Sequence, residues 1–353
     1  MNIGKQAGFI KDNNNFYKDG FLELPCLYNS PQVILQSVVN SPSAKHVEKE
    51  QAIYINNPFS TGIMRYCEIE EGFWIIATKI TFSKNVMFKA IYDKDFPIDY
   101  YMLTFSIFES EVKLQNTVVD KTVFPCEYWG FNRPESEVGA YFYEGSTCEF
   151  YLYGFSKGWA KHNLSFETLP EENQIKKFLT SDEGFITYQD IVPNAVELSK
   201  EILINLEKNN QDLLSKAILK TRTFQLISTF FKNASIDQRI GNYSSIEILE
   251  YEKIAKAEKL LIDTITNAFL GIEYIAEKVG MSPTKLKLTF KLVHGVSMMQ
   301  YHKEKKLLFA MQLIENTDMQ IKNIALATGY KSSSKFTANF KKRFGKMPSE
   351  IRL

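Results

Sequence analysis

The stretch IALATGYKSSSKFTANFKKRFG, residues 324–345, decides how the C-terminal part of this chain folds. Apolar residues at helical spacing predict a short amphipathic helix that ends at Gly329, and apolar residues return at Phe336 and Phe340 in a second helix. A short helix, a tight glycine turn and a polar helix with a thin apolar stripe are typical of a helix-turn-helix. Helical hairpins with an intervening glycine also occur in many all-α proteins, so this stretch alone leaves both interpretations open.

A second copy of the layout lies upstream in IEYIAEKVGMSPTKLKLTFKLVHG, residues 272–295. Ala276 and Gly280 stand four residues apart and precede the corresponding pair by 49 positions, and the apolar pair of the following helix precedes its counterpart by 50. Two copies at a near-constant offset are hard to obtain by chance. We therefore predict two helix-turn-helix motifs, with Gly280 and Gly329 at positive φ or at a close backbone approach.

The net charge of +1 conceals a division along the chain. Residues 280–353 contain 14 Lys and Arg against 4 Asp and Glu, a net charge of +10, which leaves −9 for residues 1–279. A basic segment joined to an acidic one is typical of a nucleic-acid-binding domain attached to a domain that does not bind nucleic acid. Charged runs are often only solvated surface, but here they lie on the polar side of the repeated motif, and we expect double-stranded DNA as the partner.

The remaining chain changes in composition near its middle. Residues 1–168 contain short runs such as FWIIATKITF and CEFYLYGF, which predict the strands of a β-barrel or sandwich. Residues 169–243 predict a helical linker whose apolar surface serves dimerisation or packs on the β-domain, and residues 244–353 hold the two motifs. The expected fold class is α+β multidomain: an N-terminal β-barrel or sandwich, a helical linker and a C-terminal all-α double helix-turn-helix.

The segment between the two motifs predicts one rigid helix over residues 297–316, with Lys303, Lys305 and Lys306 on its outer side. A helix of this kind holds two DNA-reading helices at a fixed separation. If that separation is about 34 Å, both helices enter successive major grooves on one face of a duplex.

With these motifs, residues from about 244 to the end resemble the DNA-binding domain of the AraC/XylS family of bacterial transcription regulators. The first motif resembles the family's first helix-turn-helix, with Ser282 before the recognition helix, and IALATGYKSSSKFTANFKKRFGKMPSEIR is similar to the family signature. The chain departs from the family at Lys306, where an Arg is common, and the two side chains differ in bidentate binding. The resemblance implies a cupin-like N-terminal domain that binds an effector, followed by helices that dimerise.

The resemblance also assigns side chains on the second helix of each motif to DNA. Ser282 is expected as the N-cap, Lys287 reaches guanine O6 or N7, and Thr284 and Leu288 contact thymine methyl groups. Short side chains on the second motif imply permissive readout. The residues at base-facing positions are Thr284, Lys287, Leu288, Ser333, Ser334, Thr337 and Ala338. The residues expected to contact phosphate are Lys285, Lys291, Lys306, Lys331, Lys335, Lys341, Lys342 and Arg343.

The β-rich segment contains many aromatic residues, which are its candidates for effector binding. Most strand aromatics belong to a core, and the remainder can line an apolar effector pocket. The effector-binding candidates are Trp74, Tyr100, Tyr101, Trp129, Tyr141 and Tyr143.

Catalytic and metal chemistry find no support in the sequence. Two of the four histidines, His294 and His302, fall in the DNA-binding segment, so a cupin-type metal cluster cannot be assembled, and no Gly-rich phosphate loop or nucleophile elbow occurs. The four cysteines are widely spaced and indicate buried thiols rather than a zinc site or a disulfide framework. We expect no enzyme, no cofactor, no metal and no membrane contact, and a cytoplasmic location, because neither a signal peptide nor a run of about 18 apolar residues occurs.

Together these features predict a sequence-specific DNA-binding transcription regulator whose N-terminal domain senses a small molecule. We expect a homodimer, with RNA polymerase as a further candidate partner. The alternative is a constitutive DNA-binding architectural protein whose β-domain is a structural or protein-interaction module.

Overall fold

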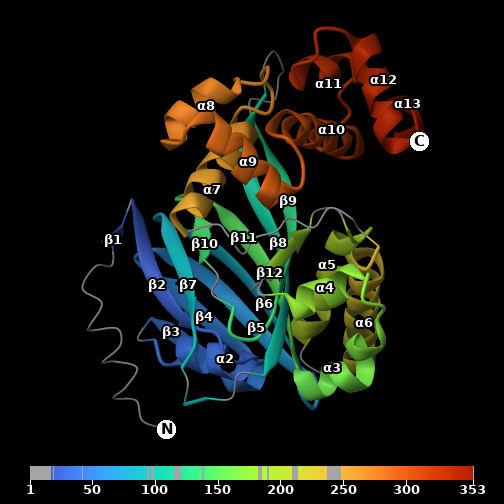
Figure 1. The fold of residues 1–353 in the computed structure, drawn as a ribbon. Helices are drawn as coiled ribbons and strands as arrows, with labels where there is room; N and C mark the ends of the chain where they lie inside the picture. Colours follow the sequence, from blue (N-terminus) through green and yellow to red (C-terminus); the bar gives the residue numbers. More distant parts are fainter. Residues whose placement is uncertain are drawn as a thin grey trace. The chain divides into compact units, whose positions relative to one another are not determined.

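The computed structural model describes residues 17–352 except 19, 42, 94, 97–98, 115–120, 137–138, 182–184, 189–190, 209–213 and 237–247. The chain divides into two compact units, one formed by residues 1–108 and 127–244 and the other by residues 109–126 and 245–353 (Figure 1).

The first unit is built on two β-sheets. The smaller sheet has the order β1-β2-β7-β10, with bounds Tyr17–Lys18, Phe21–Leu27, Val86–Ile91 and Gly139–Phe142. The larger sheet has the order β12-β9-β8-β11-β6-β5-β4-β3, with bounds Phe185–Tyr188, Lys121–Asn132, Tyr100–Lys113, Thr147–Ser156, Phe73–Phe82, Ser60–Glu70, Ala52–Asn57 and Ala44–Val47. The predicted strand-rich N-terminal fold is confirmed, and FWIIATKITF forms β6 from end to end.

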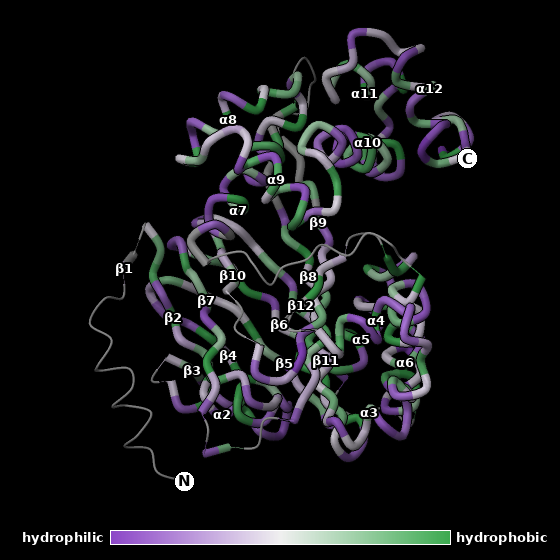
Figure 2. Tube along the Cα trace, viewed as in Figure 1, coloured by the Kyte–Doolittle hydropathy of each residue, from purple (hydrophilic) through white to green (hydrophobic). Residues whose placement is uncertain are grey.

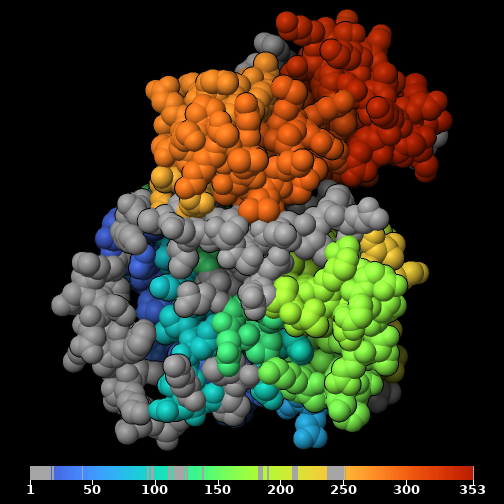
Figure 3. Space-filling view, viewed as in Figure 1, coloured from blue at the N-terminus to red at the C-terminus, as the bar shows by residue number. Residues whose placement is uncertain are grey.

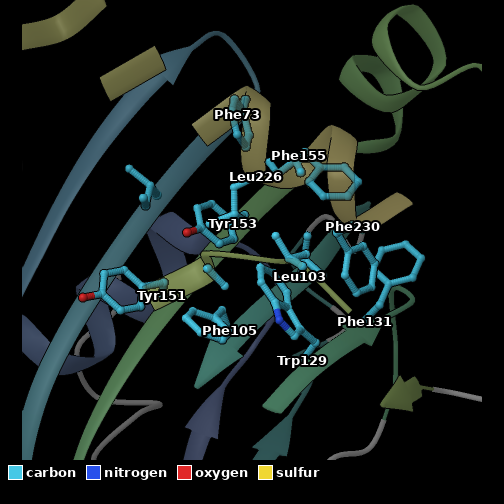
Figure 4. Packing of buried hydrophobic residues seen from close by; sticks show 14 of the residues in the cluster. Phe73, Leu103, Phe105, Trp129, Phe131, Tyr151, Tyr153, Phe155, Leu226 and Phe230 are labelled. Atoms are coloured by element: carbon cyan, nitrogen blue, oxygen red, sulfur yellow. The ribbon is translucent and has the colours of Figure 1, made fainter. Parts of the chain in front are cut away.

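Strand alternation gives the larger sheet two different faces. On β6, Phe73 and Ile75 enter the main core of the unit, while Trp74 and Ile76 pack in a second cluster on the other face. The main core is aromatic: Phe105 and Trp129 stack with ring centroids 4.5 Å apart (Figure 4). Figure 2 shows hydrophobic residues interspersed with hydrophilic ones along these strands.

Helices cover the core face of the larger sheet. They are α3 (Lys157–Asn163), α4 (Gln174–Thr180), α5 (Ala195–Lys208) and α6 (Ser215–Ala234), while α2 (Pro31–Val39) packs in the second cluster. Ile202 of α5 and Phe230 of α6 are fully buried in the same core as Trp129. Of the two uses open to the apolar surface of residues 169–243, packing on the β-domain therefore accounts for the buried face of these helices.

The second unit is helical. It contains α7 (Ile248–Asp263), α8 (Ile272–Val279), α9 (Pro283–His294), α10 (Met298–Asn316), α11 (Ile321–Ala327), α12 (Ser333–Phe344) and α13 (Pro348–Ile351). The helix pairs α8–α9 and α11–α12 are the two predicted motifs, and α10 is the predicted connecting helix. Figures 1 and 3 show the first motif in orange and the second in red as adjacent parts of this unit.

A short β-segment also belongs to the second unit. Residues 109–126, which include the last residues of β8 and the first residues of β9, group with the helices. The Phe124 ring meets the Phe309 ring of α10 edge-on at 5.2 Å. Both phenylalanines are buried. This grouping rests on contacts between segments that are far apart in the sequence, whereas the predicted boundaries place residues 1–168 together.

Candidate nucleic-acid interface

The first motif turns at Gly280. This glycine has φ 65°, and the backbone N–H of Met281 donates to the Ala276 carbonyl at 3.0 Å, which closes the end of α8. Ser282 then caps α9, since its Oγ accepts a hydrogen bond from the Lys285 backbone N–H at 3.3 Å, and a proline fills the first helical position. The predicted cap and the predicted positive φ are confirmed.

The second motif uses the same devices. Gly329 has φ 72°, and the Tyr330 backbone N–H donates to the Ala325 carbonyl at 2.9 Å. Ser332 caps α12 by accepting from the Lys335 backbone N–H at 3.4 Å. The two recognition helices are each 12 residues long, so the sequence repeat is a structural repeat.

The recognition helix α9 presents long side chains to solvent. Leu286 and Phe290 are fully buried and fix its inner face, whereas Thr284, Lys287 and Leu288 are exposed. Leu288 keeps 68% of its surface accessible, which is unusual for a leucine in the middle of a helix. The predicted base-facing residues of this helix therefore lie together on its open side.

The recognition helix α12 presents short side chains instead. Phe336 and Phe340 are fully buried, Ser334 and Ala338 are exposed, and Thr337 is half-buried. An open hollow of about 780 Å³ lies against this helix. It is lined by Ser333, Ser334, Thr337, Ala338, Lys341, Lys342 and Met347.

Seven of the eight phosphate candidates are exposed, and one is not. The exposed residues are Lys285, Lys291, Lys331, Lys335, Lys341, Lys342 and Arg343. Lys306 is buried, and its ammonium donates to the Asn267 carbonyl at 2.6 Å. This placement does not suit a phosphate contact, and it results from the position of α10, which packs against α7, α9, α11 and α13.

Two of the exposed cations already have acidic partners within the unit. Lys285 forms an ion pair with Glu250 of α7, and Arg343 forms one with Glu304 of α10. Both pairs are partly exposed, so each stabilises the fold only weakly.

Helix α10 is more deeply buried than its sequence indicates. The expectation that Lys305 and Lys306 face outward was wrong, and only Lys303 is exposed. Burial lowers the pKa of Lys306 to about 8. Burial, followed by the charge of Lys306, lowers the pKa of His302 to about 4. These groups form the polar interior that joins the two motifs.

Arg352 is a structural residue whose role the sequence did not reveal. Its guanidinium donates to the carbonyls of Ile314, Thr317 and Met319, with the Thr317 contact at 3.0 Å. These carbonyls lie at and beyond the end of α10, where no intrahelical donors remain. The position of this arginine in the family signature was the available signal.

The six effector candidates do not form one site. Trp129 lies in the main core, where its ring is 5.2 Å from that of Phe230, and Tyr101 packs against the same core, 5.9 Å from Phe131. These two residues fill the space between the sheet and its helices.

The other four candidates occupy two further places. Trp74 and Tyr100 pack in the second cluster, on the opposite face of the sheet. Tyr141 and Tyr143 each meet the ring of Phe21 edge-on, at 5.3 and 5.5 Å. Trp74 and Tyr100 therefore share one environment away from the main core, and Tyr141 and Tyr143 share another around Phe21.

Two kinds of feature are absent from the described residues. Among them, no three His, Cys, Asp or Glu side chains are grouped as metal ligands. No helix within the described ranges has the length and apolar character needed to cross a membrane.

Comparison with known proteins finds a family match within the second unit and several similar regulators. Residues 275–353 match the family described as helix-turn-helix domain. The virulence regulon transcriptional activator VirF of Yersinia enterocolitica is 40% identical over 78 residues, which are 22% of this chain and 29% of VirF. The probable transcription factor PqrA of Proteus vulgaris is 36% identical over 86 residues, or 24% of this chain and 70% of PqrA.

A solved structure is also similar to part of the chain. A transcriptional regulator with an AraC-type DNA-binding domain from Chromobacterium violaceum is 31% identical, with 29% of this chain and 91% of that chain covered at a TM-score of 0.28. The chain spans less than a third of the length of the VirF relative that it matches.

Proposed function

We propose a function for this chain, which belongs to the AraC/XylS family of transcription regulators. We propose that the second unit binds operator DNA through α9 and α12 and that the whole chain regulates transcription in response to a small molecule. The observation that carries the proposal is the pair of capped 12-residue helices whose open faces bear the predicted base-facing residues within a segment of net charge +10.

Salt dependence and sequence preference test the proposal together. Lysines around both helices neutralise DNA phosphates and so release the counterions bound to the DNA, which makes affinity fall steeply with salt concentration. Specificity requires contacts to base edges. We would select bound sequences from a random duplex pool with the full-length chain at near-physiological salt. Enrichment of a motif is expected. Binding without enrichment would favour the architectural alternative.

Lys287 provides the sharper test of base reading. Lys287→Ala should lower affinity for the selected duplex about tenfold more than for unrelated DNA, because a good base contact discriminates by about 1–3 kcal/mol. Lys303→Ala is the matched control, since Lys303 is an exposed lysine of the same unit that lies outside both recognition helices. Equal losses on both DNAs would make Lys287 a phosphate contact.

We propose that the effector binds on the face of the larger sheet opposite the face that packs on the main core. Along β6, Trp74 and Ile76 belong to one apolar cluster and Ile80 and Phe82 to another, and the half-buried Thr78 lies between them. The Thr78 hydroxyl group therefore lies between two apolar clusters on the same face of the sheet.

The neighbouring strand β8 repeats the pattern. Met102 belongs to the first cluster and Phe108 packs against the second, with Thr104 and Ser106 half-buried between them. Tyr28, which follows β2 of the smaller sheet, hydrogen-bonds Thr104, so this face looks across to the other sheet. A strip of hydroxyl groups between apolar clusters suits an uncharged ligand with both apolar and hydroxyl or carbonyl groups.

Trp74 adds a donor to this site. Its buried indole N–H has no hydrogen-bond partner within the described part of the chain, and a buried donor of this kind is costly unless something accepts from it. Ligand-dependent thermal stabilisation in a library of neutral metabolites should therefore be weakened by Trp74→Phe and by Thr78→Val. Thr81→Val, on the other face of β6, is the control. Stabilisation that both variants leave unchanged would place the site elsewhere.

We further propose a homodimer formed through α5 and α6. Ile204 of α5 and Ile218 of α6 keep 50% and 36% of their surface exposed although the opposite faces of both helices are buried. Light scattering should report a dimer for the natural chain and a monomer for Ile204→Glu with Ile218→Glu. Ile236→Glu, beyond the other end of α6, is the control, and a dimer that survives the double change would exclude this surface.

A further inference from the structure

The two recognition helices differ in the length of the side chains that they present. Helix α9 exposes Lys287 and Leu288, which extend several bonds from the backbone. Helix α12 carries Ser334, Thr337 and Ala338 at its base-facing positions, and no side chain among these three extends beyond the γ position. Hydrogen bonding of the bidentate kind that lysine, arginine or glutamine makes to purine edges is thus unavailable at these three positions.

The hollow beside α12 leaves room for DNA to approach the helix closely, which compensates for these short side chains. Its base-facing wall consists of short side chains, and Lys341 and Lys342 line it as well. Short side chains allow the backbone of the helix to approach a base edge closely, and the two exposed lysines are suited to the flanking phosphates. Met347, which precedes α13, adds an apolar group to the lining.

Two of the short side chains that line the hollow carry methyl groups. Thr337 has a γ-methyl and Ala338 a β-methyl, one residue apart on the open side of α12. The major-groove feature that apolar contact recognises is the C5 methyl of thymine, and alanine and the threonine methyl are side-chain groups that make this contact. Serine and threonine hydroxyls bond to any base, so they add affinity without choosing a sequence.

We propose that α12 reads a thymine-rich half-site through thymine methyl groups packed against Thr337 and Ala338, whereas α9 reads its half-site with longer side chains. This inference rests on the proposed DNA-binding function and specifies the sequence class of one half-site. It replaces the expectation of merely permissive readout from the second motif.

Deoxyuridine substitution tests the proposal because it removes the C5 methyl and leaves the hydrogen-bonding edge unchanged. The probe is the duplex selected from a random pool by the full-length chain, and the half-site whose preference Lys287→Ala relaxes belongs to α9. Replacing thymines by deoxyuridine in the other half-site should weaken binding about fourfold for each methyl that packs on α12, the factor expected for one buried CH₂-sized group.

A variant identifies the protein side of the contact. Thr337→Ser removes one methyl and keeps the hydroxyl at a half-buried position, so folding should be unaffected, which far-UV circular dichroism can verify. The variant should weaken binding to the thymine duplex and lose its sensitivity to deoxyuridine at the thymine that packs on Thr337, while the thymine that packs on Ala338 remains sensitive. Deoxyuridine in the flanking DNA is the control and should change nothing.

Two results would overturn the proposal in distinguishable ways. If deoxyuridine in the second half-site has no effect while the first half-site remains specific, α12 contacts phosphate only and the proposed regulator function stands. If the pool yields no enriched sequence at all, the proposed function fails together with this inference.

Discussion

The two turn glycines should differ in what an added methyl group costs. Gly280 and Gly329 both have positive φ, 65° and 72°, where an L-residue is strained by roughly 1–2 kcal/mol. A Cβ at Gly280 meets nothing within 4 Å. A Cβ at Gly329 would lie 2.3 Å from the Thr266 carbonyl oxygen and 3.0 Å from the Lys306 ammonium.

The close approach at Gly329 is costly because it disturbs the surroundings of the buried Lys306 ammonium. Moving the Thr266 backbone displaces the neighbouring Asn267 carbonyl, which accepts from Lys306 at 2.6 Å. Losing a hydrogen bond to a buried group costs about 1–3 kcal/mol. We therefore expect Gly280→Ala to lower the free energy of unfolding by about 1–2 kcal/mol and Gly329→Ala by about 2–5 kcal/mol.

The tryptophan distribution makes the measurement selective. Trp74, Trp129 and Trp159 all lie in the first unit, so tryptophan fluorescence follows that unit, whereas far-UV circular dichroism also follows the helical second unit. With about 4 °C per kcal/mol, the second unit should melt about 4–8 °C lower in Gly280→Ala and about 8–20 °C lower in Gly329→Ala. The fluorescence transition should stay in place. Equal shifts for the two variants would refute the packing argument at Gly329.

Three further predictions concern charges of the second unit. Burial lowers the pKa of Lys306 from 10.5 to about 8, so the unfolded chain holds this proton more tightly, and stability should rise between these pH values in the natural chain but not in Lys306→Met, measured by urea denaturation. The pKa of His302 is lowered from 6.5 to about 4, so stability should be lost as pH falls through this interval, and His302→Asn should flatten the acid limb of the same titration. Glu304→Gln frees Arg343 from its ion pair and should strengthen non-specific DNA binding a few-fold at low salt, with a salt slope steeper by about one; unchanged binding would show that Arg343 does not reach phosphate.

Local patterns determined most of the DNA-binding unit. The glycine at each turn and the serine before α9 act on their own neighbours in the chain, and the spacing of Leu286 and Phe290 sets one buried stripe. Because these effects extend over only a few residues, the sequence predicted both motifs, the connecting helix and the open faces of α9 and α12. The strands were predictable for the same reason, since runs such as residues 73–82 carry the period of a sheet.

Tertiary structure decided everything that depends on distant neighbours. Lys306 looks like a surface lysine in the sequence, yet it is buried because α10 packs on helices from both motifs, and its carbonyl partner lies 39 positions away. Trp74 and Trp129 look alike as strand aromatics, but they occupy opposite faces of the larger sheet. Residues 109–126 join the second unit through contacts such as that of Phe124 with Phe309, and the hollow beside α12 needs Met347 as well as the helix itself. Each of these outcomes follows from chain segments that meet only after folding, so no local pattern records them.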